Sequence, residues 1–218
     1  PWVNALQSVE IHAATLPGRE RRIADTPIDN LSFLVESLLP EVTRLADRPY
    51  ALFGHNMGAL IAFEVLRAIE KKGLPAPFQL FVSAYRSPER PRSMPELHAL
   101  PDDQFLSALR QYGGTPEEVL AHQETMALLG PMIRADFKLH ETFQFTAGTP
   151  VDVPIVALCG KDDHVVPRSE MEGWSAHTAA GFDLNEFSGA HFFIHESLNE
   201  VAGFIHRRMH GDALAEAL

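Results

Sequence analysis

The residues best suited to chemistry lie in a glycine-flanked segment, Gly54-His55-Asn56-Met57-Gly58. An apolar run that favours a strand precedes it, and a run with helical spacing follows it, which predicts a sharp strand-turn-helix elbow with Asn56 at its tip. Such elbows present a nucleophile, and the N–H of the next residue, here Met57, can stabilise an oxyanion. Glycines are expected on both sides because the strand and the helix approach closely at the turn.

Two later segments supply an acid and a histidine in the order that a catalytic triad of this type requires. Asp162 and Asp163 follow an apolar, strand-like run at 155–159, and an Asp at the carboxyl end of a strand can orient a histidine. We favour Asp163 for this role. His191 lies in a loop of small residues ahead of a helical run. The predicted catalytic positions are therefore Asn56, Asp163 and His191.

The remaining histidines and the single cysteine indicate no metal or redox chemistry. Eleven histidines are scattered along the chain without an HExxH or similar spacing, so no metal site and no cofactor is expected. Cys159 lies inside a predicted strand, which favours a core position, and one cysteine cannot form an internal disulfide. His55, His164 and His195 are interpreted as local or supporting residues near the site.

Composition narrows the class of protein. The 218 residues include 29 acidic and 18 basic side chains, a formal net charge of -11, which disfavours nucleic acid as a partner. No apolar run approaches the roughly 18 to 20 residues that span a bilayer, so no membrane segment is expected. The sequence begins at Pro1 without a signal-like segment, and a cytoplasmic location is the default expectation.

The order of apolar runs predicts the architecture. Continuous apolar, strand-like runs alternate with helical spacing, which is typical of an α/β domain whose mostly parallel sheet is covered by helices on both faces. We expect one such domain over 1–218. The predicted strands are 9–15, 50–53, 79–84, 155–159 and 182–187, and the main predicted helices are 28–45, 57–72 and 192–209.

The alternation breaks between Arg86 and Pro150, where no strong strand is found. A proline-rich stretch at 87–92 opens this region, and helical patterns follow at 102–111, 116–121 and 125–145. We interpret 87–148 as a helical lid inserted over the carboxyl ends of the strands, where ligands bind in such folds. The alternative is a helical excursion that covers a sheet edge.

Together these residues resemble the type II thioesterases of polyketide and nonribosomal peptide biosynthesis. The resemblance spans nearly the whole chain and includes motifs inside the predicted lid. It rests on Leu16-Pro17-Gly18-Arg19, Phe53-Gly54-His55-x-Met57-Gly58-Ala59, Ala62-Phe63-Glu64, His98-Ala99-Leu100-Pro101-Asp102, Tyr112-Gly113-Gly114-Thr115-Pro116, Arg134-Ala135-Asp136-Phe137 and Gly189-Ala190-His191-Phe192-Phe193.

The resemblance implies an α/β-hydrolase fold with a mobile helical lid. It also implies cleavage of acyl groups from the phosphopantetheine thiol of acyl or peptidyl carrier proteins. Carried over by position, Asn56 stands where the family has its nucleophilic serine, Asp163 is the acid, His191 the base and Met57 one oxyanion donor. The second donor of the family lies on a glycine-containing loop after an earlier strand, which is expected upstream of Pro1.

Asn56 alters the chemistry that the motif predicts. A carboxamide has no proton that a histidine can remove near neutral pH, and loss of the nucleophile in a related triad costs on the order of 10⁶ in turnover. The change could be engineered. It could instead be natural in a binding protein, in an enzyme that uses His191 and Asp163 as a general-base pair, or in one where His191 activates water directly. Asparagine is a less obvious choice than alanine for a designed knockout, which favours a natural change.

The predicted function is a type II thioesterase-like protein that acts on carrier-bound acyl groups, with hydrolysis in doubt. One alternative is an enzyme of another class on the same scaffold, for cyclisation, dehydration or isomerisation. The other is a non-catalytic module that binds carrier proteins.

Overall fold

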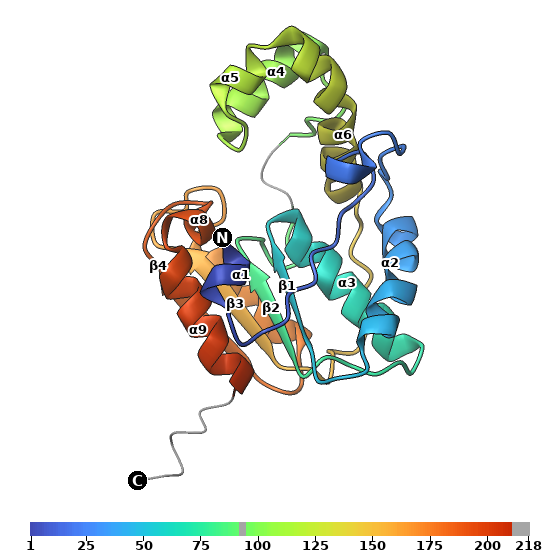
Figure 1. Ribbon diagram of the computed structural model, residues 1–218, viewed down its shortest axis with the longest axis vertical. Helices are drawn as coiled ribbons and strands as arrows, with labels where there is room; N and C mark the ends of the chain where they lie inside the picture. The colour runs from blue at the N-terminus through green and yellow to red at the C-terminus, as the bar shows by residue number, and fades with distance from the viewer. Residues whose placement is uncertain (92–94, 211–218) are drawn as a thin grey trace. The chain divides into compact units, whose positions relative to one another are not determined.

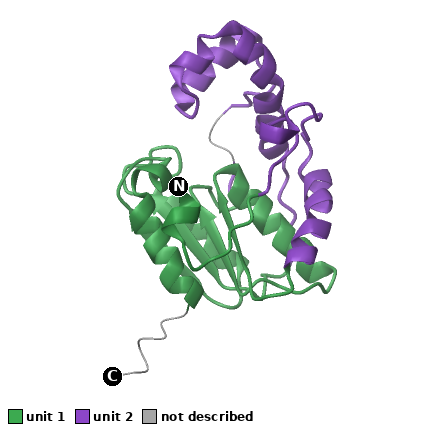
Figure 2. Ribbon diagram, in the orientation of Figure 1, with its two compact units in different colours: residues 1–13, 46–88, 149–218 green, residues 14–45, 89–148 purple. Residues whose placement is uncertain are grey.

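A computed structural model describes residues 1–91 and 95–210, which form two compact units. The sheet unit comprises 1–13, 46–88 and 149–218, and the helical unit comprises 14–45 and 89–148 (Figure 2). Residue 92 of the predicted proline-rich stretch and residues 93–94 of the predicted insertion lie outside the described residues.

The sheet unit is built on four parallel strands (Figure 1). Their order in the sheet, β1-β2-β3-β4, is also their order in the chain. The predicted α/β class with a parallel sheet is confirmed, and the carboxyl ends of all four strands meet at one edge. The strands are β1 Ala51–His55, β2 Gln79–Ser83, β3 Ile155–Gly160 and β4 Phe182–Phe187.

Helices cover both faces of this sheet. Helix α3 (Met57–Lys71) packs on β1 and β2, while α1 (Trp2–Ala5) and α9 (Leu198–His210) lie across the other face (Figure 1). Every residue of β2 and β3 is buried, as expected for central strands that read as continuous apolar runs. The core between α9 and the sheet includes Phe81, Leu158, Phe193, Val201 and Ile205.

Two predicted elements of the sheet unit differ from the structure. The predicted strand at 9–15 is wrong, because within the described residues this stretch pairs with no strand and so has no ladder. The predicted helix at 192–209 is divided into α8 (Phe193–Glu196) and α9. Ser197 interrupts it with φ -109° and ψ 33°, and its hydroxyl donates to the carbonyl of Ser188 at 2.7 Å.

Short elements between β3 and β4 were not predicted. They are α7 (Arg168–Met171) and the 3₁₀ helix η2 (Glu172–His177), which carries the fully buried Trp174. The indole N–H of Trp174 donates to the carbonyl of Tyr85 at 2.8 Å. These elements are only four and six residues long, so the sequence shows no extended hydrophobic periodicity that would predict them.

The helical unit has its own apolar core. It contains η1 (Glu20–Arg22), α2 (Leu31–Leu45), α4 (Asp102–Tyr112), α5 (Glu117–Leu120) and α6 (Gln123–Glu141). Helix α2 begins three residues later than predicted because Asn30 caps it, its side-chain oxygen accepting the Phe33 N–H at 2.9 Å. Helix α6 ends four residues earlier than predicted. The core residues are Leu97, Phe105, Leu109, Leu120 and Phe137.

Buried and partly buried charged side chains connect the segments of the helical unit. Arg19 pairs with Asp136 at 2.6 Å, which joins two motifs that are 117 residues apart in the sequence. The buried carboxylate of Glu141 accepts the N–H groups of Leu97 and His98 at 2.8 and 3.0 Å and contacts His98 Nδ1 at 2.6 Å. These contacts fix the chain before α4 against the end of α6. No helix among the described residues is long and apolar enough to cross a membrane.

Candidate active site

The elbow begins where β1 ends. Asn56 lies between β1 and α3 with φ 51° and ψ -128°, a conformation that L-residues rarely adopt. Its N–H donates to the carbonyl of Ser83 in β2 at 2.8 Å, which holds the turn on the neighbouring strand. Backbone strain of this kind persists only when the surrounding structure enforces it, and it is concentrated at functional sites.

The two elbow glycines have different roles. A Cβ on Gly54 would collide with the backbone carbonyl of Gly58, so the close approach of strand and helix requires glycine there. A Cβ on Gly58 would meet nothing within 4 Å in the part of the chain that is described. The expectation that both glycines are required by close approach is therefore wrong for Gly58.

Met57 is the first residue of α3. The first N–H groups of a helix have no acceptor within the helix, and the helix dipole adds partial positive charge at this end. The Met57 N–H is thus a donor of the type that stabilises a developing oxyanion beside the elbow tip.

The acid and the histidine are in direct contact. Asp163 Oδ2 lies 2.9 Å from His191 Nδ1, and both side chains are almost fully buried. The other oxygen of Asp163 accepts the N–H groups of Val165 and Val166 at 2.8 and 2.9 Å. Burial acts to raise the pKa of Asp163, but the bonds from His191, Val166 and Val165 outweigh it and hold that pKa below its ordinary value. Asp163 is therefore an ionised partner for His191, whereas Asp162 is exposed.

Close packing of two loops brings this pair together. A Cβ on Gly160 would collide with the backbone carbonyls of Gly189 and Ala190. The N–H of Lys161 donates to Phe187 at 2.9 Å and that of Asp162 to Gly189 at 3.0 Å. No role was predicted for Gly160, although its place at the end of a strand and close before the aspartates was a signal.

His55 is more closely integrated with the site than the sequence indicated. Its Nδ1 is 2.9 Å from the Ser83 hydroxyl, and its ring centroid is 5.6 Å from that of His191. Burial, reinforced by His191 and His195, lowers the pKa of His55 to about 3, so its imidazole is neutral at ordinary pH. His164 and His195 are exposed.

Cys159 lies outside this arrangement. Cys159 is fully buried in β3, and burial raises the pKa of its thiol to about 11, which makes it a core residue rather than a nucleophile. Across 1–91 and 95–210, no group of three or more His, Cys, Asp or Glu side chains could hold a metal ion.

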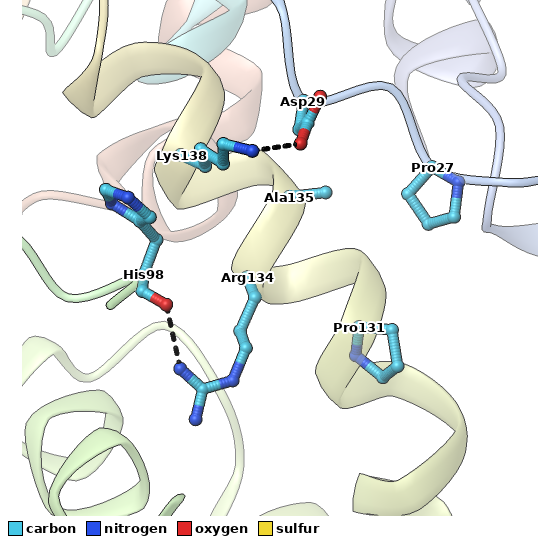
Figure 3. A pocket seen from close by; sticks show the side chains of 7 residues that line it. All are labelled: Pro27, Asp29, His98, Pro131, Arg134, Ala135 and Lys138. Carbon is cyan, nitrogen blue, oxygen red and sulfur yellow. Dashed lines mark hydrogen bonds and ion pairs between the residues drawn. The ribbon is translucent and has the colours of Figure 1, made fainter. Parts of the chain in front are cut away.

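A separate pocket of about 290 Å³, lined in part by charged side chains, lies within the helical unit (Figure 3). Its charged side chains already have partners, because Lys138 pairs with Asp29 at 2.6 Å and Arg134 donates to the His98 carbonyl at 3.0 Å. Arg134 also pairs with Asp102 at 2.6 Å and stacks on the Phe105 ring. These contacts indicate a structural role. The lining residues are Pro27, Asp29, His98, Pro131, Arg134, Ala135 and Lys138.

Comparison with known proteins identifies the family of this chain. Residues 1–209 match the thioesterase domain family. The chain belongs to this family. It is 39% identical over 203 residues to the gramicidin S biosynthesis protein GrsT of Aneurinibacillus migulanus, covering 93% of this chain and 79% of GrsT. It is 32% identical over 205 residues to the thioesterase PikA5 of Streptomyces venezuelae, covering 91% and 70% of the two chains.

Solved structures of thioesterases have the same fold as this family member. The type II thioesterase BorB from the borrelidin biosynthetic cluster superposes with a TM-score of 0.79 at 37% identity, over 88% of this chain and 78% of BorB. The thioesterase RedJ from the prodiginine pathway of Streptomyces coelicolor superposes with a TM-score of 0.85 at 30% identity, over 94% and 82%. The α/β-hydrolase architecture expected from the resemblance is thereby confirmed.

Proposed function

We propose that this chain is a type II thioesterase-like protein that acts on acyl groups held as thioesters on the phosphopantetheine arm of carrier proteins. The single observation that carries the proposal is the buried 2.9 Å contact between Asp163 and His191, at the sheet edge where the elbow ends β1. Homology to thioesterases of nonribosomal peptide and polyketide pathways supports the substrate class.

Each residue of the site has a role in this proposal. Asp163 binds Nδ1 of His191, which leaves Nε2 as the nitrogen that takes up a proton. The Met57 N–H stabilises the negative charge on the thioester oxygen during attack. Asn56 occupies the position at which a serine would attack the thioester carbon.

Asn56 limits the chemistry of the chain. A serine at the tip would lose its proton to His191, attack the carbonyl carbon and release the pantetheine thiol, and water would then cleave the acyl-enzyme. The carboxamide of Asn56 cannot follow this course. We propose that Asn56 replaces the serine of a working hydrolase and that the chain still binds the acyl carrier.

The helical segment 87–148 is proposed as the lid that covers bound acyl groups, as the sequence predicts. Its apolar core, centred on Phe105 and Phe137, supports the idea that these helices move as one body. Cross-linking α4 to α6 within the segment should then leave acyl binding intact, whereas deletion of the segment should weaken it.

Thiol release from acyl-pantetheine and acyl carrier protein tests the proposed function. We expect release by Asn56→Ser, little by the chain with Asn56, and loss of activity when His191→Ala is added to Asn56→Ser. His12→Ala, at an exposed histidine outside the proposed site, is the matched control and should leave the rate unchanged.

Other results of the same assays would favour one of the alternative functions. Release by the Asn56 chain that His191→Ala abolishes would indicate direct activation of water. A rearranged acyl product without thiol release, lost in His191→Ala, would indicate an enzyme of another class. Carrier binding without turnover in any variant, including Asn56→Ser, would indicate a binding module.

A further inference from the structure

Ser83 links the elbow to the neighbouring strand through two different groups. It is the last residue of β2, is fully buried, and lies opposite His55 in the parallel register. Its carbonyl accepts the Asn56 N–H at 2.8 Å, and its hydroxyl lies 2.9 Å from His55 Nδ1. One residue therefore holds both the tip of the elbow and the residue before it.

His55 extends this connection to His191. The two imidazole centroids are 5.6 Å apart with the rings tilted by 48°. The His55 ring centroid also lies 5.8 and 5.9 Å from those of Phe192 and Phe193. The centroids of Phe192 and His191 are 5.0 Å apart, with an angle of 83° between the ring planes. The His191 ring is thus held by Asp163 through Nδ1 and by two rings, His55 and Phe192, through packing.

The surroundings of His55 are suited to a neutral ring. Its Nε2 is buried and has no hydrogen-bond partner in the described part of the chain, whereas a protonated imidazole needs an acceptor at each nitrogen. Two charged imidazoles at this separation would also repel each other. A neutral His55 leaves His191 as the one ring of the pair that can take up a proton.

We propose that His55 and Ser83 form a positioning pair for His191, which fixes the His191 ring against Asp163 and the elbow without exchanging protons itself. The pair lies at the ends of β1 and β2, and His55 packs on His191 in the loop after β4. This inference rests on the proposed role of His191 as the base.

Two variants separate the contributions of the pair. His55→Phe keeps a ring beside His191 but loses the bond to Ser83, and Ser83→Ala removes the hydroxyl but keeps the backbone bond to Asn56. The matched controls are His177→Phe, a buried histidine packed between the Phe63 and Trp174 rings, and Ser87→Ala, another fully buried serine.

The first readout does not depend on hydrolysis. In isotope-labelled full-length chain with Asn56, NMR would follow the Nδ1 proton that His191 shares with Asp163. We expect its exchange with water to accelerate by roughly tenfold in Ser83→Ala and His55→Phe, the factor that follows from the loss of one ordinary hydrogen bond. The control variants should leave this exchange rate unchanged even where urea unfolding shows that they lose as much stability as the two positioning variants.

The second readout is activity on the Asn56→Ser background. The two positioning variants should lower kcat with KM unchanged, whereas His177→Phe and Ser87→Ala should lower neither. An unchanged Nδ1 exchange rate in both Ser83→Ala and His55→Phe would overturn the proposal. If Asn56→Ser is inactive but the exchange rates change as expected, the proposed function fails while the positioning role stands.

Discussion

At the scale of single residues, the site depends on which groups are charged and which are neutral. Asp163 is kept ionised by three hydrogen bonds that outweigh its burial, and His55 is kept neutral because burial offers its Nε2 no acceptor among the described residues. His191 lies between them, in contact with both. An imidazole with one charged partner and one neutral neighbour is suited to the role of base proposed for His191.

Asp163 and Asp162 provide a direct test of this arrangement. On the Asn56→Ser background, Asp163→Asn should lower kcat by about 10⁴-fold, because an amide no longer selects the required tautomer of His191 or stabilises its charged form. Asp162→Asn, at the adjacent exposed position, should leave kcat unchanged. Steady-state kinetics on an acyl-pantetheine substrate measures both, and equal effects of the two substitutions would contradict the assignment of the acid.

The low pKa of His55 predicts a pH-dependent stability. The unfolded chain takes up a proton near pH 6.5 that the folded chain resists until about pH 3, so the stabilisation is complete above 6.5 and is lost as the pH falls towards 3. The groups that act on His55 are His191 and His195, which oppose its charge, and Asp163, which favours it. The full effect is at most about 5 kcal/mol.

Urea unfolding between pH 7.5 and 4.5 measures this dependence. The unfolding free energy should fall with acidification, and His55→Phe should fall less steeply over the same range. Parallel curves for the two proteins would show that His55 does not carry the effect.

At the scale of elements, close backbone contacts constrain the junction of β1 with α3. Gly54 has no room for a Cβ because the backbone of Gly58 lies against it, and Asn56 takes a positive φ between them. The bond from the Asn56 N–H to Ser83 ties this turn to β2. These backbone contacts set the geometry of the turn between the strand and the helix.

Alanine substitutions at the two glycines should have opposite outcomes. Gly54→Ala should destabilise the protein by more than about 3 kcal/mol, because the backbone itself must move to admit a Cβ. Gly58→Ala should be neutral or stabilising by up to about 1 kcal/mol, since alanine favours a helix and the space is open. Urea unfolding gives both values, and a large loss in Gly58→Ala would show a constraint at that position.

At the scale of the whole molecule, the chain passes twice out of the sheet unit and back, forming the helical unit from 14–45 and 89–148. Each unit has its own buried core, one around the sheet and one around Phe105 and Phe137. The helical unit is held by contacts between distant parts of the sequence, including Arg19 with Asp136 and Glu141 with Leu97 and His98. Its stability therefore rests on a few polar contacts as well as on apolar packing.

Glu141→Gln tests whether the helical unit can lose stability without a loss of stability in the sheet unit. The amide retains one acceptor for the N–H groups of Leu97 and His98 but loses the charge, which should cost about 2 kcal/mol. We expect faster hydrogen exchange in α4 and α6 and unchanged exchange in β2 and β3. Glu124→Gln, in the exposed first turn of α6, is the control. Uniform acceleration across both units would show that they unfold as one.

The sequence alone determined the elements whose signals are local. The elbow, the aspartate loop and the histidine loop were recognisable because each needs small or polar residues beside an apolar run, and the strand at 182–187 had the bounds that the structure shows. Short-range periodicity and turn chemistry depend only on neighbouring residues. The residue types at the elbow also indicated that Asn56, a carboxamide, stands where a nucleophile is expected.

Only the tertiary structure decided the contacts between segments that are distant in the sequence. These include the packing of His55 on His191, the bond of Ser83 to the elbow, the pairing of Arg19 with Asp136 and the failure of 9–15 to form a strand. A strand exists only where a partner supplies its ladder, and a buried histidine is neutral or charged according to what surrounds it. Neither the partner of a strand nor the surroundings of a buried histidine can be predicted from the adjacent residues in the sequence.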